Sequence, residues 1–307
     1  MSFKKETPLA NAVFWAARKG NLALLQLLLN SGRVDVDCKD NYGTTALMVA
    51  SYSGHYECVR ELIMQGADIN LQREALLPCS LQHNKDMTKS LSSYLSLEPP
   101  LNSRPRMVVR PCLQPARVGT PKWWTLCSRT EPTSMTSSVQ WDSSPIPLQD
   151  GATPLFLASQ EGHLTVVRQL LSSGAKVNQP REDGTAPLWM AAQMGHNEVV
   201  KVLLLRGADR DADRTDGSTA LFKAAHKGHC TVIEELLKFN PSLGLLKNGS
   251  TALHAAVMGG NPKTVKLLLG ANADPTLRNK NNDLPADLTK NERILRILRP
   301  QILNGES

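Results

Sequence analysis

The sequence predicts an all-α solenoid built from repeated helix-turn-helix units with projecting β-turns. Three observations support this fold class. Gly-His pairs recur along the chain, an aliphatic helical pattern follows each pair, and a turn with a Thr/Pro/Leu signature precedes each Ala-rich segment. The pairs begin at 54, 162, 195 and 228, and the last three are 33 residues apart. Because one such unit cannot bury its apolar face alone, the units must stack.

Each unit contains signals for two helices. At Thr153–Leu155, the threonine suits a helix N-cap and proline is tolerated at the first helical position. Ala pairs such as Ala191-Ala192 allow two helices to approach closely. Val166, Val167 and Leu170 then recur at helical spacing in the second helix. The repeat signature consists of the glycines expected to end the first helix in the left-handed conformation, with the histidines that follow them: Gly54, Gly162, Gly195, Gly228, His55, His163, His196 and His229.

Polar turns connect the units. AKVNQPREDG at 175–184 and ADRDADRTDG at 208–217 are rich in turn-forming residues. Together, the TPL element, the Ala pair, Gly-His-x-x-Val-Val, Leu-Leu and Gly-Ala-Asp resemble the ankyrin repeat, over residues 7–74 and 150–299. The resemblance implies an elongated, slightly curved all-α solenoid whose turns and inner helices line a concave face.

The repeats divide the chain into four parts. We expect two N-terminal ankyrin repeats in 1–74, an interrupting segment in 75–149, four repeats in 150–280, and C-terminal capping helices with a tail in 281–307. The four repeats with their cap should fold independently. The N-terminal pair should be marginally stable if it loses its neighbours to a disordered insert.

The interrupting segment differs from the rest of the chain in composition. It holds 10 of the 19 prolines and only one glycine, and its Pro/Ser/Arg-rich composition predicts disorder. A shifted reading frame permits hidden Gly-His pairs beginning at 85 and 118, which are 33 residues apart. We therefore interpret residues 75 to about 136 as the frameshifted remains of two repeats. The alternative is a real disordered insert whose eight Lys/Arg and four Asp/Glu make a weakly basic binding arm; transcript sequence would separate the two.

Composition indicates a soluble intracellular protein. The 307 residues are 41% hydrophobic and 21% charged. No stretch approaches the roughly 20 apolar residues that span a bilayer, and the start lacks a secretory apolar core. We expect a monomer in the cytoplasm, with the nucleus also possible. The six cysteines lack metal-ligand spacing, so we interpret them as reduced thiols.

No constellation of residues predicts catalysis. The histidines of the Gly-His pairs fall on successive repeats, about 10 Å apart, which is too far to share one metal ion. As the resemblance implies, they should bond backbone in the neighbouring turn. The chain also lacks a Gly-x-Ser-x-Gly elbow and a phosphate-binding loop. We therefore expect no enzyme activity, metal, cofactor or small-molecule substrate.

The resemblance implies which positions face a partner: the turn residues beside the hairpin glycine and the two residues before each Gly-His. Trp189, which replaces the histidine of the family's TPLH element, is either a partly exposed anchor or a filler of the helix interface. The candidate partner-binding residues are Tyr42, Tyr52, Glu182, Asp183, Trp189, Gln193, Met194, Thr215, Asp216, His226 and Lys227.

Two functional hypotheses follow from these features. The first is a non-catalytic adaptor or scaffold that binds an unidentified protein along the concave face. The alternative is a weak binder of nucleic acid or anionic surfaces through the net charge of +7. That charge is modest for the length and not gathered into one run, so a nucleic-acid partner is the less favoured of the two. Steep loss of binding with added salt would support it.

Overall fold

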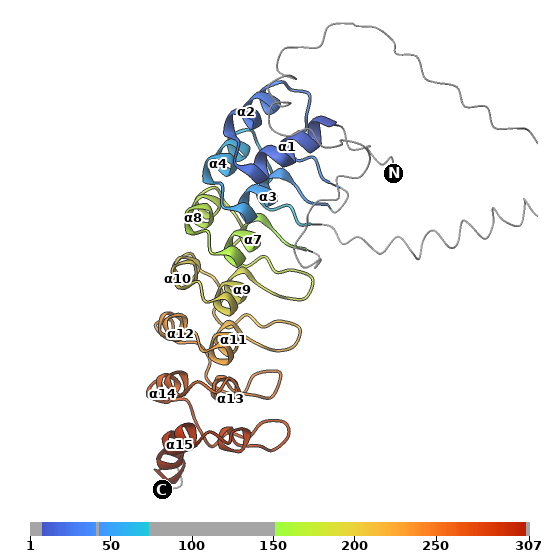
Figure 1. Cartoon of the computed structure of the whole chain (residues 1–307). Helices are drawn as coiled ribbons and strands as arrows, with labels where there is room; N and C mark the ends of the chain where they lie inside the picture. The colour runs from blue at the N-terminus through green and yellow to red at the C-terminus, as the bar shows by residue number, and fades with distance from the viewer. Residues whose placement is uncertain (1–7, 41–42, 74–150, 305–307) are drawn as a thin grey trace, which may run out of the picture. The chain divides into compact units, whose positions relative to one another are not determined.

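The computed structural model describes residues 8–40, 43–73 and 151–304 (Figure 1). These ranges lie in one compact unit formed from the chain on both sides of residues 77–148. The interrupting segment and Tyr42 therefore lie outside the described residues. Within those ranges the regular structure is helical, apart from one isolated antiparallel bridge between Lys39 and Thr45.

Pairs of helices follow one another along the chain. The first helices of the pairs are α1 (Pro8–Lys19), α3 (Ala46–Ser53), α7 (Pro154–Glu161), α9 (Pro187–Met194), α11 (Ala220–Lys227) and α13 (Ala252–Met258). The second helices are α2 (Leu22–Asn30), α4 (Tyr56–Met64), α8 (Leu164–Ser172), α10 (Asn197–Leu205), α12 (Cys230–Leu237) and α14 (Pro262–Gly270). A 3₁₀ turn, η1 (Pro285–Leu288), and α15 (Glu292–Asn304) follow them.

The helices form two layers. Each first helix packs on the first helix of the next pair, and each second helix packs on the next second helix. The hairpins that join successive pairs extend on the side of the first helices, away from the second helices (Figure 1). At the C-terminal end, η1 packs on α13 and α15 packs on α14. This arrangement confirms the predicted all-α solenoid.

Local signals in the sequence set the helix ends. The hydroxyl of Thr153 accepts a hydrogen bond from the backbone N–H of Phe156 at 3.2 Å, and Pro154 occupies the first turn. Helix α9 is an exception, because Ala186 at its N-cap has no side-chain acceptor. The predicted left-handed glycines end four of the first helices: Gly54, Gly162, Gly195 and Gly228.

The core lies between the two layers. Ala191 and Ala192 of α9 are fully buried, as expected of small residues where helices approach closely. Val166, Val167 and Leu170 of α8 are also fully buried. Burial of a Val or Leu side chain contributes about 1.5–3 kcal/mol. Because much of this burial is against neighbouring pairs, the stability of each pair depends on the pairs beside it.

Of the two N-terminal helix pairs, α1–α2 and α3–α4, the second packs against the α7–α8 pair on the far side of the interrupting segment. Helix α3 packs directly on α7, although 100 residues separate Ser53 from Pro154 in the chain. The N–H of Arg73 donates to the carbonyl of Ala152 at 3.0 Å, and the N–H of Gly151 donates to the carbonyl of Arg73 at 2.9 Å. Arg181, Thr185 and Gly184 make the same pair of bonds in an uninterrupted hairpin, both at 3.0 Å. The stack therefore continues across the interrupting segment, and residues 8–73 are not left without a partner.

No helix in the described parts of the chain is long and apolar enough to cross a membrane.

Candidate functional site

Apart from Trp189, the sequence-predicted partner-binding residues that the structure describes fall into two groups. Glu182, Asp183, Thr215 and Asp216 lie in the hairpins that precede α9 and α11. The others are at the C-terminal ends of first helices: Tyr52 in α3, Gln193 and Met194 in α9, and His226 and Lys227 in α11. Hairpins and first helices lie on the same side of the stack (Figure 1). We call the exposed and half-buried side chains of these two groups the inner surface.

Most of these side chains are accessible to a partner. Glu182, Thr215, Asp216, His226 and Lys227 are exposed. Met194 is 48% exposed, so its apolar side chain is available for contact with another molecule. Tyr52, Gln193 and Asp183 are half-buried. The inner surface thus combines charged, amide and apolar side chains.

The histidines of the repeat signature hold successive pairs together. Nε2 of His163 lies 2.9 Å from the carbonyl of Tyr52, and Nε2 of His196 lies 2.9 Å from that of Gln160. His55 and His229 make the equivalent contacts with the carbonyls of Arg18 and Gln193, both at 3.0 Å. Each ring is therefore engaged with the preceding repeat. Among the residues described, no three His, Cys, Asp or Glu side chains gather closely enough to hold a metal ion.

The glycine of the Gly-His pair also makes room for the next histidine. Gly54 has a φ of +75°, and a Cβ built on it would lie 2.6 Å from the His163 ring. A side chain at this position would be strained by its backbone conformation and would also displace the imidazole. Glycine is therefore needed at residue 54 for two separate reasons.

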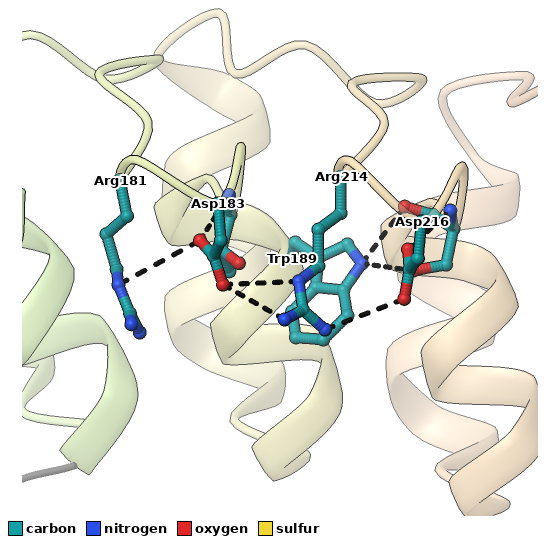
Figure 2. A network of polar contacts seen from close by, with 7 residues as sticks. Arg181, Asp183, Trp189, Arg214 and Asp216 are labelled. Atoms are coloured by element: carbon teal, nitrogen blue, oxygen red, sulfur yellow. Dashed lines mark hydrogen bonds and ion pairs between the residues drawn. The ribbon is translucent and has the colours of Figure 1, made fainter. Parts of the chain in front are cut away.

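Trp189 is not an exposed anchor, because only 3% of its surface is accessible. Its ring lies between α9 and the hairpin that precedes α11, and its Nε1–H donates to the carbonyl and hydroxyl oxygens of Ser218, at 3.1 and 3.2 Å (Figure 2). A buried indole needs an acceptor for its N–H, and Ser218 provides two. Of the two roles considered for Trp189, its burial agrees with the filler of the helix interface and not with a partly exposed anchor.

An ion-pair network covers this tryptophan. Arg214 Nη2 lies 3.1 Å from Asp183 Oδ2, and Arg214 Nη1 lies 3.5 Å from Asp216 Oδ2. The guanidinium of Arg214 is 5.3 Å from the centroid of the Trp189 ring, within cation–π range (Figure 2). Arg181 is similarly placed over the Phe156 ring, at 4.9 Å. Successive hairpins are therefore joined by side chains as well as by backbone.

The network shifts the pKa values of both carboxyl groups. Burial raises the pKa of Asp183, but hydrogen bonds from Thr185 and the charges of Arg181 and Arg214 outweigh burial and lower it. Burial also raises the pKa of Asp216, but hydrogen bonds from Ser218 and the charges of Arg214 and Lys223 outweigh burial and lower it below its usual range. The carboxylate of Asp183 thus supports the fold of the hairpins. Because it already accepts bonds from Thr185 and pairs with Arg214, it is less available to a partner.

Sequence reasoning did not identify the arginines of this network. The signal was present, because Arg-Glu-Asp-Gly at 181–184 and Arg-Thr-Asp-Gly at 214–217 place an arginine two residues before an aspartate. The repeated motif indicated turns, and it also positions the arginine of one hairpin near the aspartate of the previous one.

Sequence comparisons agree with this architecture. A family described as Ankyrin repeats (3 copies) matches residues 4–73, 135–213 and 188–279. The chain is 70% identical over 307 residues to Ankyrin repeat domain-containing protein 29 of Danio rerio, and the match covers 100% of both chains. It is 60% identical over 299 residues to the Homo sapiens protein of the same name, covering 97% of this chain and 96% of that protein.

A solved structure has the same fold. The crystal structure of the human ASB11 ankyrin repeat domain matches with a TM-score of 0.65 and 21% sequence identity, covering 96% of this chain and 98% of that one. The family match, the two full-length relatives and the stacked helix pairs show that the chain belongs to the ankyrin-repeat family.

Proposed function

We propose that this chain is a non-catalytic scaffold that binds a partner protein along its inner surface. Ankyrin repeats generally mediate protein–protein interaction through an extended surface made by successive repeats. The residues proposed to contact the partner are the accessible members of the predicted set: Tyr52, Glu182, Gln193, Met194, Thr215, Asp216, His226 and Lys227.

One observation carries this proposal: the repeats share their buried positions and differ at their inner-surface positions. A buried Leu opens the first helix, a buried Ala lies near its middle, and the Gly-His pair follows. The two residues before the glycine are instead Tyr52-Ser53, Gln160-Glu161, Gln193-Met194 and His226-Lys227. Packing explains the shared positions, but it does not require a different pair of half-buried or exposed residues in each repeat. Varied side chains on a constant frame are what recognition of an irregular partner needs.

The chemistry of the described residues also favours binding. The histidines of the signature are engaged by backbone carbonyls. Cys58 is buried, and burial raises the pKa of its thiol, which disfavours the nucleophilic thiolate. These groups serve the fold rather than a reaction.

Affinity capture from cell lysate with the full chain tests the proposal. The test variant changes Glu182, Gln193 and Met194 to Ala and leaves Asp183 in place, because Asp183 supports the hairpins. The control variant changes Lys201, Leu205 and Arg206, which are exposed on α10 and in the turn after it, to Ala. We expect a captured protein to be lost by the test variant and retained by the control, with both variants equally folded by circular dichroism. Loss with the control alone, or retention by both, would contradict binding at the inner surface.

A further inference from the structure

A cluster of basic residues lies on one face of α11. Lys223, His226 and Lys227 are spaced i, i+3 and i+4, so their side chains are neighbours on the helix surface. His226 and Lys227 are exposed, and Lys223 is half-buried with its Nζ 5.5 Å from the centroid of the Trp189 ring. Among the described residues, no Asp or Glu forms an ion pair with any of the three.

Two exposed methionines flank this cluster. Met194 at the end of α9 is 48% exposed, and Met258 at the end of α13 is 47% exposed. Both helices pack on α11. Gly259 brings the end of α13 against the carbonyl of His226, where a side chain would clash. We call Met194, Lys223, His226, Lys227 and Met258 the Met–basic patch.

The neighbouring charges leave the centre of the patch positive. Burial lowers the pKa of His226, and the adjacent Lys223 and Lys227 lower it further, so the two lysines carry the charge at neutral pH. Asp216, in the hairpin before α11, is occupied by Arg214, and Lys247, in the following hairpin, is paired with Asp213. The charge of Lys223 also lowers the pKa of Asp216, so part of its positive charge is compensated within the chain. An incoming carboxylate would therefore meet Lys223 together with Lys227, which has no ion-pair partner in the described chain.

The spacing of the methionines sets the size of the ligand. Packed helices lie about 8–10 Å apart, so Met194 and Met258, two helices apart, are separated by roughly 20 Å. An extended chain advances about 3.3–3.6 Å per residue, so roughly six residues span this distance. Met side chains adapt to varied apolar groups, which suits them to receive the ends of such a segment.

We propose that the Met–basic patch binds an extended acidic segment of a partner protein, with apolar side chains about six residues apart on Met194 and Met258 and carboxylates between them on the lysines of α11. This inference rests on the proposed function and names the chemistry of the partner. A peptide fits better than a nucleic acid, because the flanking positions are aliphatic rather than base-stacking aromatics.

The probe is the fluorescent peptide acetyl-Leu-Ser-Asp-Glu-Asp-Ser-Leu-amide, with fluorescence anisotropy measured on the full chain at low ionic strength. We expect Lys227→Glu to weaken binding at least about tenfold, because it places like charges together. Met258→Ala should weaken binding to a smaller extent. The matched control Lys266→Glu reverses an exposed lysine on α14 and should leave affinity unchanged. Because a lysine at a helix C-terminus also stabilises the helix, the urea midpoint of each variant is measured alongside.

Two control ligands complete the experiment. A peptide with lysines in place of the three acidic residues should not bind, and single-stranded oligonucleotides should not compete with the acidic peptide. Equal binding of both peptides, an unchanged affinity in a folded Lys227→Glu variant, or competition by the oligonucleotide would overturn the inference. If the peptide fails to bind while lysate capture still depends on Glu182, Gln193 and Met194, the acidic-segment inference fails and the scaffold function stands.

Discussion

Trp189 and His254 occupy the same position in their repeats, and each bonds forward to the next hairpin in its own way. Trp189 donates to the carbonyl of Ser218 at 3.1 Å, and His254 Nε2 lies 3.2 Å from the carbonyl of Asp283. In both cases the acceptor is 29 residues ahead. Both repeats therefore have a hydrogen bond from this side chain to the backbone of the next hairpin. Either an indole or an imidazole ring can make it.

The two positions differ in their other contacts. Thr251 caps α13, its N–H donates to Nδ1 of His254 at 3.2 Å, and its hydroxyl lies 2.7 Å from the same nitrogen. Helix α9 begins without a side-chain cap at Ala186, and Arg214 from the next hairpin covers the Trp189 ring instead. The contact made by His254 is supported by capping within α13, and the contact made by Trp189 is supported by an ion-pair network between hairpins. Different side chains thus support the same backbone arrangement.

Truncation of Trp189 should have the largest effect. We expect Trp189→Ala to lower the free energy of unfolding by about 3–5 kcal/mol, because it opens a cavity and leaves Ser218 without its donor. Trp189→His should lower the free energy of unfolding by less than Trp189→Ala. His254 shows that an imidazole at this position can bond to the backbone of the next hairpin. Urea denaturation of both variants measures the difference, and an equal cost for the two would contradict the equivalence of the positions.

Loss of the His254 ring should have the next largest effect. His254→Ala removes the capping bond and the forward bond, and we expect a cost of about 2 kcal/mol at neutral pH. The matched control is Met258→Ala, because Met258 lies on the same helix and is exposed. Chemical denaturation at pH 7.5 would test this order of effects; a control that costs as much as His254→Ala would exclude a specific role for the ring.

The same residue predicts a pH dependence. Burial lowers the pKa of His254 below its ordinary 6.5, and its contacts fit the neutral tautomer, which donates from Nε2 and accepts at Nδ1. The folded state therefore binds fewer protons than the unfolded state, and this contribution is present above pH 6.5 and lost as the pH falls below it. His254→Ala should show a smaller loss of stability between pH 7 and pH 5 than the unchanged chain. An identical pH slope would show that another group titrates.

Neutralising the ion pair over Trp189 should have a smaller effect. Asp183→Asn is expected to cost about 1 kcal/mol at pH 7, because both partners are partly exposed to solvent. Since the folded pKa of Asp183 is lowered, its contribution is present above its usual value of 3.8 and lost as the pH falls through the folded value. Thermal unfolding of Asp183→Asn and of the exposed control Glu182→Gln would measure the cost. A cost in both variants would point to general charge effects.

Deletion of residues 75–149 should have the smallest effect on stability. The deletion joins Glu74 to Asp150 and gives Arg-Glu-Asp-Gly, the sequence of the hairpin at 181–184. Because α3 already packs on α7, we expect the shortened chain to unfold in a single transition at an unchanged urea midpoint. Hydrogen exchange should show the same protection in α3 and α7. Separate unfolding of residues 8–73 at low urea would contradict a continuous stack.

Much of the fold could be predicted from the sequence because its signals are local. Thr153 caps the start of α7 and Gly195 ends α9, and both act through contacts within one turn of the helix. The role of Trp189 could not be settled in this way, because its acceptor lies 29 residues ahead. The Met–basic patch also depends on contacts between repeats, since Met194, Lys227 and Met258 come from three helices. The resemblance to the ankyrin repeat implied that Met194 faces a partner, but only the stacking shows which charged residues lie on the neighbouring helices.

The most direct test of the central claim compares the two layers of one repeat. A photo-crosslinking amino acid is placed at residue 194, on the inner surface, or at residue 205, on α10; the native Met194 and Leu205 side chains are 48% and 66% exposed. Exposure alone would favour crosslinking from residue 205. Binding at the inner surface predicts a crosslinked partner polypeptide from residue 194 and none of comparable yield from residue 205. A stronger crosslink from residue 205, or none from residue 194, would contradict it.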